Sequence, residues 1–155
     1  MDKDIKLPAL PYKSLRVLRV HEGKALIECQ TLEGDALNWA VAEAAQEEAY
    51  IHNGKMVVYR ADSDGGNIEY SPSTIWAQGG PIIEREALWV REYAVASPAI
   101  AHLVTPDKKW FAYASRSYDG GTSGCYYGET FLIAAMRCYV ASKLGNEVAV
   151  PKELI

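Results

Sequence analysis

The spacing of apolar residues changes several times along this chain, and each change predicts a different element of secondary structure. An imperfect apolar and polar alternation at 15–20 and an apolar run at 25–29 flank the polar turn 21–24, which predicts a β-hairpin. Further strands are indicated by short apolar runs between turn-forming residues, at 56–60, 68–70, 88–95, 99–104 and 110–114. Because consecutive strands are joined by turns, we expect antiparallel pairing.

Two stretches repeat at helical spacing instead. Residues 35–48 carry one apolar stripe, made of Leu37, Ala40, Val41 and Ala44. The stronger pattern begins at Glu129 or Thr130 and consists of Leu132, Ala135, Met136, Tyr139 and Val140. Gly145 is expected to close this second helix in the left-handed conformation, and residues 147–151 are expected to run extended against another part of the protein.

These elements predict an α+β fold with an antiparallel β-sheet packed with two main α-helices in a single domain. A chain of 155 residues with 49% hydrophobic and 23% charged residues suits one compact core. Residues 115–128 are rich in glycine and are expected to form a surface loop. Its tyrosines 118, 126 and 127 would form a lid, a partner surface, or merely an exposed loop.

Residues 70–84 combine hydroxyls, an indole, an amide and a glycine pair, and they are predicted to form a loop. Such a loop can offer backbone N–H groups, hydroxyl donors and a stacking face to a small anionic ligand. The candidate ligand-binding residues in it are Ser71, Ser73, Thr74, Trp76, Gln78, Gly79 and Gly80. The alternative is that the glycines only form a tight turn.

Three residues outside this loop complete the candidate ligand-binding set. Trp39 lies beside the main apolar stripe of the first helix and could cover a groove edge, and Thr130 lies at the start of the second helix. Arg137 falls among apolar positions, where a guanidinium needs partners. We expect it to pair with Glu84 or Glu86, or with loop carbonyls, and direct contact with a ligand is the alternative.

Catalytic and metal chemistry have little support in the sequence. Glu84 and Glu86 would share one face of a strand and could act as acid and base, although solvated surface acids are far commoner. The three cysteines, at 29, 125 and 138, and the three histidines are scattered, without metal-ligand spacing. We therefore assign no catalytic residue, metal ligand or cofactor, and we expect Cys138 to be a structural, buried thiol.

Charge and the character of the first residues set expectations for partners and location. The net charge of −4 argues against strong binding to nucleic acid, which requires clustered Lys and Arg. Residues 1–10 mix charges with prolines and contain no apolar core of a secretion signal, and no membrane-spanning segment follows. The expected location is the cytoplasm, with no membrane association.

Three segments together resemble the NinX-like family of small tailed-phage and prophage proteins, a family of unknown function. Residues 32–42 read L-E-G-D-A-L-N-W-A-V-A, residues 71–86 read S-P-S-T-I-W-A-Q-G-G-P-I-I-E-R-E, and residues 128–145 read G-E-T-F-L-I-A-A-M-R-C-Y-V-A-S-K-L-G. The chain departs from the family pattern at Ile75, where an acid is common, and at 129–131, where the approach to the helix is usually richer in proline. The resemblance covers 31–155 and implies a phage origin and action inside an infected bacterium.

Residues 1–30, with the predicted hairpin, are expected to form an extension to a NinX-like domain at 31–155. The leading hypothesis is a non-enzymatic phage accessory protein that binds and sequesters a small anionic ligand, and one candidate for this ligand is a nucleotide signal of bacterial antiphage defence. One alternative is an inhibitor or adaptor that binds a host protein. A second is a small nucleotide hydrolase acting through Glu84 and Glu86, and a symmetric homodimer is a further option.

Overall fold

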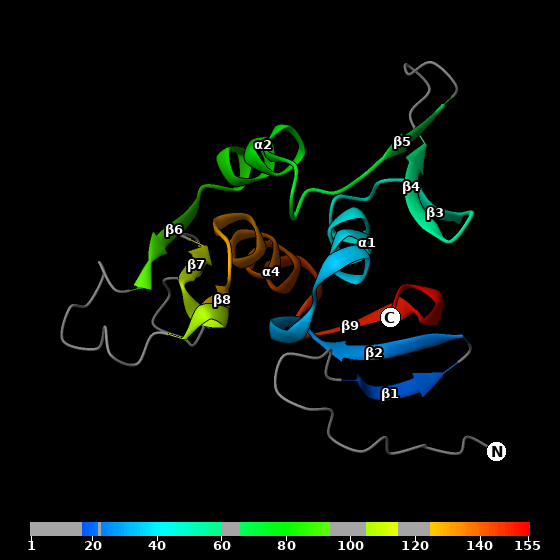
Figure 1. Cartoon of the computed structure of the whole chain (residues 1–155), viewed down its shortest axis with the longest axis horizontal. Coiled ribbons are helices and arrows are strands. Elements are labelled where there is room, and N and C mark those ends of the chain that lie inside the picture. Colours follow the sequence, from blue (N-terminus) through cyan, green and yellow to red (C-terminus); the bar gives the residue numbers. More distant parts are fainter. Residues whose placement is uncertain (1–16, 22, 60–65, 94–104, 115–124) are drawn as a thin grey trace.

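The computed structural model describes residues 17–21, 23–59, 66–93, 105–114 and 125–155 (Figure 1). The single-domain α+β fold with antiparallel sheets is confirmed. In the described part of the chain the strands form three small sheets rather than one, and three α-helices are present rather than two. The helices are α1 (Gly34–Ala44), α2 (Trp76–Glu86) and α4 (Phe131–Leu144). Short 3-10 turns lie at η1 (Cys29–Thr31), η3 (Pro106–Lys108) and η5 (Lys152–Leu154).

The first sheet joins the two ends of the described chain. It has the order β1 (Val17–His21), β2 (Lys24–Glu28) and β9 (Glu147–Pro151), all antiparallel. The predicted hairpin and the predicted extended tail are both confirmed, and they pair with each other. Alternate residues of both strands face the main core, where Ala25 and Ile27 of β2 and Val148 and Val150 of β9 are buried.

The second sheet is a meander of β3 (Ala49–His52), β4 (Lys55–Tyr59) and β5 (Asn67–Glu69). Asn53 and Gly54 connect the first two strands with φ angles of 51° and 73°. Positive φ at both central residues is the turn that suits a two-residue hairpin. The predicted strands at 56–60 and 68–70 are thereby confirmed within one or two residues.

The third sheet has the order β6 (Leu88–Glu92), β7 (Trp110–Ala114) and β8 (Tyr126–Gly128). The predicted strand at 110–114 is confirmed with the same bounds. The one at 88–95 is confirmed over Leu88–Glu92, and its last two residues lie outside the described part of the chain. The predicted strand at 99–104 lies outside the described residues. Residues 126–128 were predicted as loop but form a strand that pairs with β7. The sequence of these three residues does not show this pairing, because the partner strand is a separate segment of the chain.

Helix α4 lies at the centre of the fold, between the third sheet and α1 (Figure 1). Thr130 starts it, as predicted, since its hydroxyl oxygen accepts a hydrogen bond from the Ile133 N–H at 3.2 Å. Gly145 ends it, with φ 91° and ψ −173°, so the end of the helix was predicted correctly and the left-handed cap conformation was not. No helix among the described residues is long and apolar enough to cross a bilayer.

Candidate functional site

The predicted loop at 70–84 is wrong for most of its length, because residues 76–86 form α2. Neither Gly79 nor Gly80 has a positive φ. Gly79 is required by packing instead: a Cβ there would lie 2.3 Å from the Pro72 carbonyl oxygen and 2.9 Å from Leu132 Cδ2. The glycine lets α2 approach the preceding turn and α4, a contact that outweighs its poor helix propensity.

The backbone donors expected to face a ligand are used inside the protein. The Gly79 N–H donates to the Ile75 carbonyl at 3.0 Å, and the Thr74 and Ile75 N–H groups both donate to the Ser71 carbonyl. Ser73 is buried, and both its N–H and its hydroxyl donate to Asn38 Oδ1, at 3.1 and 2.7 Å. This segment therefore does not form the donor-lined loop that the sequence predicted.

The side-chain amide of Gln78 forms hydrogen bonds through both its oxygen and its nitrogen to the backbone that precedes α2. Its Oε1 accepts from the Ser71 N–H at 2.6 Å, and its Nε2 donates to the Glu69 carbonyl at 2.9 Å. The amide thus supplies the acceptor and the donor that a neighbouring strand would otherwise offer to the backbone between β5 and α2. Gln78 also lines the pocket described below, so its position serves both the fold and the candidate site.

Arg137 meets the second of its predicted partners, backbone carbonyls, but not those of the 70–84 segment. Its Nε donates to the Leu32 carbonyl at 2.8 Å and its Nη1 to the Tyr127 carbonyl at 2.7 Å. Burial lowers the pKa of this guanidinium, and Glu33 is the foremost charge opposing that shift. The predicted ion pairs of Arg137 with Glu84 or Glu86 are not formed, since Glu86 instead binds Lys143 at 2.9 Å.

The remaining predicted residues differ in exposure and in their contacts. Trp76 is 59% exposed at the start of α2, with its indole 5.3 Å from the Phe131 ring and beside Gly80. Trp39 is half-buried on α1, and its indole nitrogen has no hydrogen-bond partner among the described residues. Thr74 is exposed, and its hydroxyl lies 3.3 Å from the Ser71 carbonyl oxygen. Gln78 is the member of the predicted set that lines the pocket described below.

The predicted pairing of Glu84 with Glu86 on one strand face is also wrong. Both residues lie on α2, where positions two apart point to nearly opposite sides of the helix. Glu86 is held by Lys143 and, at 3.2 Å, by Arg85. The geometry required for an acid and base pair is therefore absent.

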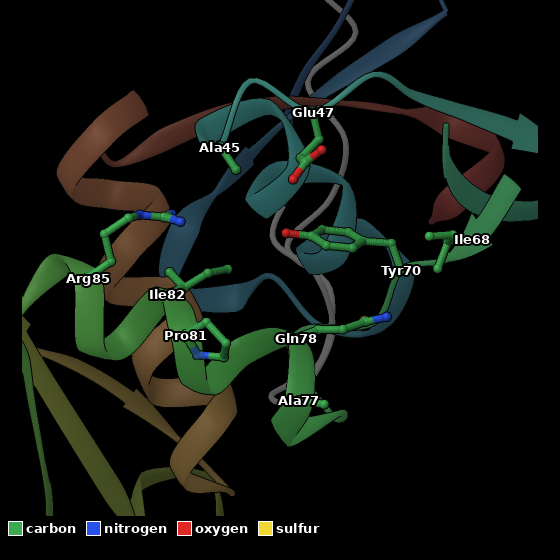
Figure 2. A pocket seen from close by; sticks show the side chains of 9 residues that line it. All are labelled: Ala45, Glu47, Ile68, Tyr70, Ala77, Gln78, Pro81, Ile82 and Arg85. Carbon is green, nitrogen blue, oxygen red and sulfur yellow. The ribbon is translucent and has the colours of Figure 1, made fainter. Parts of the chain in front are cut away.

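A pocket of about 410 Å³ lies between the end of α1, β5 and α2. We call it the α1–α2 pocket, and its lining residues are Ala45, Glu47, Ile68, Tyr70, Ala77, Gln78, Pro81, Ile82 and Arg85. The Arg85 guanidinium and the Tyr70 hydroxyl point into it from opposite sides, and the Glu47 carboxylate faces the same space (Figure 2). Apolar side chains of α2 form the floor, so the pocket combines one cation, one anion and a flat ring.

The end of α1 positions Glu47 for this arrangement. Helix α1 was predicted to continue to residue 48, but it ends at Ala44. Gln46 takes the left-handed conformation with φ 58°, and the Glu47 N–H donates to the Ala42 carbonyl at 2.9 Å. Together with the Gln46 N–H to Glu43 carbonyl bond, this is the Schellman arrangement, formed here without a glycine. The reversal turns Glu47 towards α2.

Arg85 is the exposed cation of the pocket. Its side chain is 58% exposed, and its Nε donates to Glu86 Oε1 at 3.2 Å. Hydrogen bonding to Glu86 raises the pKa of Arg85, so its charge is retained throughout the accessible pH range. A guanidinium with donors in a planar fork is suited to carboxylate or phosphate. Pro81, which has no N–H to donate to the Ala77 carbonyl one turn earlier, also lines the pocket.

A comparison with protein families matches residues 29–143 to the model described as bacteriophage P22, NinX. The chain belongs to this NinX family. A search among curated proteins finds no match to the chain. The NinX segment contains α1, α2, all of α4 but its last residue, and the whole α1–α2 pocket. The strands β2 and β9 flank the segment and pair with each other.

Several polar residues of the NinX-like segments hold separate parts of the fold together. Asn38 of the first segment binds Ser73 of the second, and Arg137 of the third binds the Leu32 carbonyl of the first. These long-range hydrogen bonds explain why polar residues occur within otherwise apolar stretches of the NinX segments. They also mean that a polar residue in a NinX segment is not by itself evidence of a ligand.

Of the nine lining residues of the pocket in this NinX protein, sequence reasoning named only Gln78 as ligand-binding, and it missed the other three polar ones, Glu47, Tyr70 and Arg85. Arg85 stands in the segment that carried the resemblance, at the end of a run first interpreted as loop and strand. Placing residues 76–86 on a helix would have put Gln78, Pro81, Ile82 and Arg85 on one face, at spacings of three and four. Glu47 and Tyr70 had no local pattern that could have joined them to that face.

Proposed function

We propose that this NinX-family protein binds a small anionic ligand in the α1–α2 pocket, without chemical turnover. The observation that carries the proposal is the placement of the exposed Arg85 guanidinium opposite Tyr70 and Glu47 in a concave, partly apolar space. At about 410 Å³, the pocket falls within the roughly 300–1,000 Å³ typical of small-molecule sites.

The chemistry of the lining favours a nucleotide over a simple anion. Arg85 would bind a phosphate, and the Glu47 carboxylate would accept from ribose hydroxyls or base N–H groups. Tyr70 is 5% exposed and turns its hydroxyl end towards the pocket. An inorganic anion alone would gain nothing from the carboxylate and would be repelled by it. Ile82 and Pro81 complete an apolar wall that a base can cover.

The phage family suggests the setting for such binding. A phage protein that holds a nucleotide in the cytoplasm of an infected bacterium, without consuming it, would lower the concentration of a nucleotide signal used in antiphage defence. The hydrolase alternative loses its basis because Glu84 and Glu86 do not share a face. Sequestration is therefore the proposed role.

Isothermal titration of the full chain with a panel of cyclic and linear nucleotides tests this proposal. Arg85→Gln should weaken binding at least tenfold, because it removes the cation from the pocket. Lys55→Gln is the matched control, since Lys55 is an exposed cation on β4 outside the pocket. Recovery of intact nucleotide after denaturation supports sequestration. Folded protein that binds none of the panel, or Arg85→Gln binding as tightly as the unchanged chain, would refute it.

A second candidate function, binding to a host protein, is supported by two neighbouring apolar side chains at the start of α2. Ile75 is 40% exposed and Trp76 is 59% exposed, and large exposed apolar residues are typical of interaction surfaces. Pull-down from host lysate tests it with Trp76→Ala as the probe and Arg85→Gln as the control. A specific partner lost only with Trp76→Ala would favour this function over nucleotide binding.

A further inference from the structure

The sheet β6–β7–β8 has two chemically different faces. The face against α4 is apolar and closed: Ala112, Ala134 and Cys138 are buried there, with Leu88, Val90, Trp110, Ala114 and Tyr126 packed around them. Because side chains alternate across a strand, the residues between these positions point to the opposite face. These residues are Trp89 and Arg91 of β6, Tyr93 directly after β6, Phe111 and Tyr113 of β7, and Tyr127 of β8.

Five aromatic rings on this opposite face form an unbroken chain across all three strands. Successive centroids are 6.2 Å apart from Trp89 to Tyr113, 6.2 Å from Tyr113 to Phe111, 6.0 Å from Phe111 to Tyr93 and 5.6 Å from Tyr93 to Tyr127. The first two pairs are nearly parallel, with interplanar angles of 4° and 18°, and the last two are edge-on. We call this row the aromatic face.

The register of the strands explains why the rings meet. Trp89 lies directly opposite Tyr113, and Phe111 lies directly opposite Tyr127. The Tyr93 N–H donates to the Lys109 carbonyl at 2.9 Å, which extends the β6–β7 ladder by one residue and brings the Tyr93 ring to Phe111. Cross-strand pairing thus fixes five rings side by side, so little side-chain entropy is left to lose on binding.

Both ends of the aromatic face carry a cation. The Arg91 guanidinium carbon lies 5.7 Å from the Trp89 ring centroid, and Lys108 Nζ lies 5.7 Å from the Tyr127 ring centroid. None of the six side chains that point to this face is acidic. Trp89 is 48% exposed, and Arg91 and Lys108 are exposed as well. The protein is acidic as a whole, yet this surface is aromatic and positively charged.

We propose that the aromatic face binds a single-stranded nucleic acid, with bases stacked on the rings and the backbone drawn to the two flanking cations. Aromatic side chains on an antiparallel sheet are a common platform for unpaired bases, and stacking tolerates any sequence. An oligosaccharide or a proline-rich peptide could also stack on rings, but neither has the repeating anionic backbone that Arg91 and Lys108 complement.

This site differs from the pocket in position and in the source of its affinity. With about two cations in contact, the logarithm of the affinity should fall with the logarithm of the salt concentration with a slope of only about −1.4. A weak salt dependence is consistent with the net charge of −4, which disfavours strong electrostatic binding. Stacking of bases on aromatic rings does not depend on that charge.

Fluorescence anisotropy with the full chain and labelled 12-nucleotide oligothymidine and oligouridine tests the proposal. Both strands should bind saturably, and Trp89→Ala should weaken binding about 5- to 100-fold because one stacking surface is lost. Arg91→Gln should reduce the salt slope by about 0.7. Trp76→Ala, which removes an exposed tryptophan elsewhere, and Arg85→Gln should both leave oligonucleotide binding unchanged.

Circular dichroism checks that each variant is folded, which is expected because Trp89 and Arg91 are exposed. A hairpin duplex should bind at least tenfold more weakly than either single strand, since its bases are already stacked. Equal binding of the duplex, full affinity of the folded Trp89→Ala variant, or saturable binding only of a proline-rich peptide or an oligosaccharide would each overturn the proposal.

Discussion

Arg137 in the middle of α4 is bonded to the backbone of Leu32, 105 residues earlier in the chain, through a 2.8 Å hydrogen bond from its Nε to the Leu32 carbonyl. The same guanidinium donates to the Tyr127 carbonyl at 2.7 Å, and that carbonyl also accepts from Gln30 Nε2 at 3.0 Å. Gln30 Oε1 in turn accepts from the Tyr127 N–H at 2.9 Å. Arg137 and Gln30 together join the start of the NinX segment to β8.

Arg137→Leu should therefore destabilise the protein strongly. The substitution removes two charge-assisted bonds and leaves the Leu32 carbonyl without this donor, which should cost about 2–4 kcal/mol in the free energy of unfolding. Urea denaturation followed by circular dichroism measures the change. Arg91→Gln, on an exposed strand position, should change the free energy by less than about 0.5 kcal/mol. A similar small effect for both variants would contradict the role given to Arg137.

The two adjacent glycines of α2 should respond differently to alanine. At Gly79, a Cβ would lie 2.3 Å from the Pro72 carbonyl oxygen, so Gly79→Ala should cost about 1–3 kcal/mol or more. At Gly80, the nearest atom is Trp76 Nε1 at 3.1 Å, on a side chain that is exposed and can move. Gly80→Ala should stay within about 1 kcal/mol of the unchanged protein, because alanine is the better helix former. Thermal unfolding of both variants measures the difference, and equal tolerance at both positions would contradict the close packing of α2.

Glu86 should contribute to the loss of stability in acid. The hydrogen bond from Lys143, followed by that from Arg85, holds the pKa of Glu86 below its usual value of 4.5 in the folded protein. A lowered folded-state pKa means that the stabilisation is present above the unfolded value and is lost as the pH falls through the folded value. Lys143→Gln should reduce this acid-induced loss.

Free energies of unfolding measured above and below pH 4.5 test this prediction in the unchanged protein and in Lys143→Gln. Glu86→Gln supplies the reference, because it cannot titrate. Combining both substitutions should add no further change in the pH dependence, since they remove the same interaction. An acid profile unaltered by Lys143→Gln would show that the pair does not contribute.

The three thiols should differ in reactivity. Cys29 and Cys138 are buried, and burial raises the pKa of each to about 12, so both are protonated at neutral pH. Cys125 is exposed. A thiol reagent at neutral pH should label one cysteine rapidly in the folded protein and all three in denaturant. Rapid labelling of Cys29, whose Sγ lies 3.2 Å from the Arg137 carbonyl oxygen, would contradict the packing of η1 against α4.

The prediction that Cys138 is a structural, buried thiol is supported by its burial. Several other local patterns in the sequence were equally informative. The strand at 110–114, the N-cap at Thr130 and the end of α4 at Gly145 follow from alternation, capping and glycine placement, which act over a few residues. The end of α1 was placed too late because Gln46 adopts the left-handed conformation usually associated with glycine. The strand β8 was missed because three residues carry too little pattern without their partner β7.

The sequence by itself determined the α+β class, most strands, the central helix and membership of a phage family, since periodicity and long ordered motifs reside in neighbouring residues. Only the tertiary structure decided that Gly79 and Gly80 belong to a helix, because the reason for Gly79 is its contact with Pro72 and Leu132. Likewise, Arg85 meets Tyr70 and Glu47 only after α2 packs beside the end of α1. The row from Trp89 to Tyr127 depends on strand register, and register is set by pairing between segments far apart in the chain.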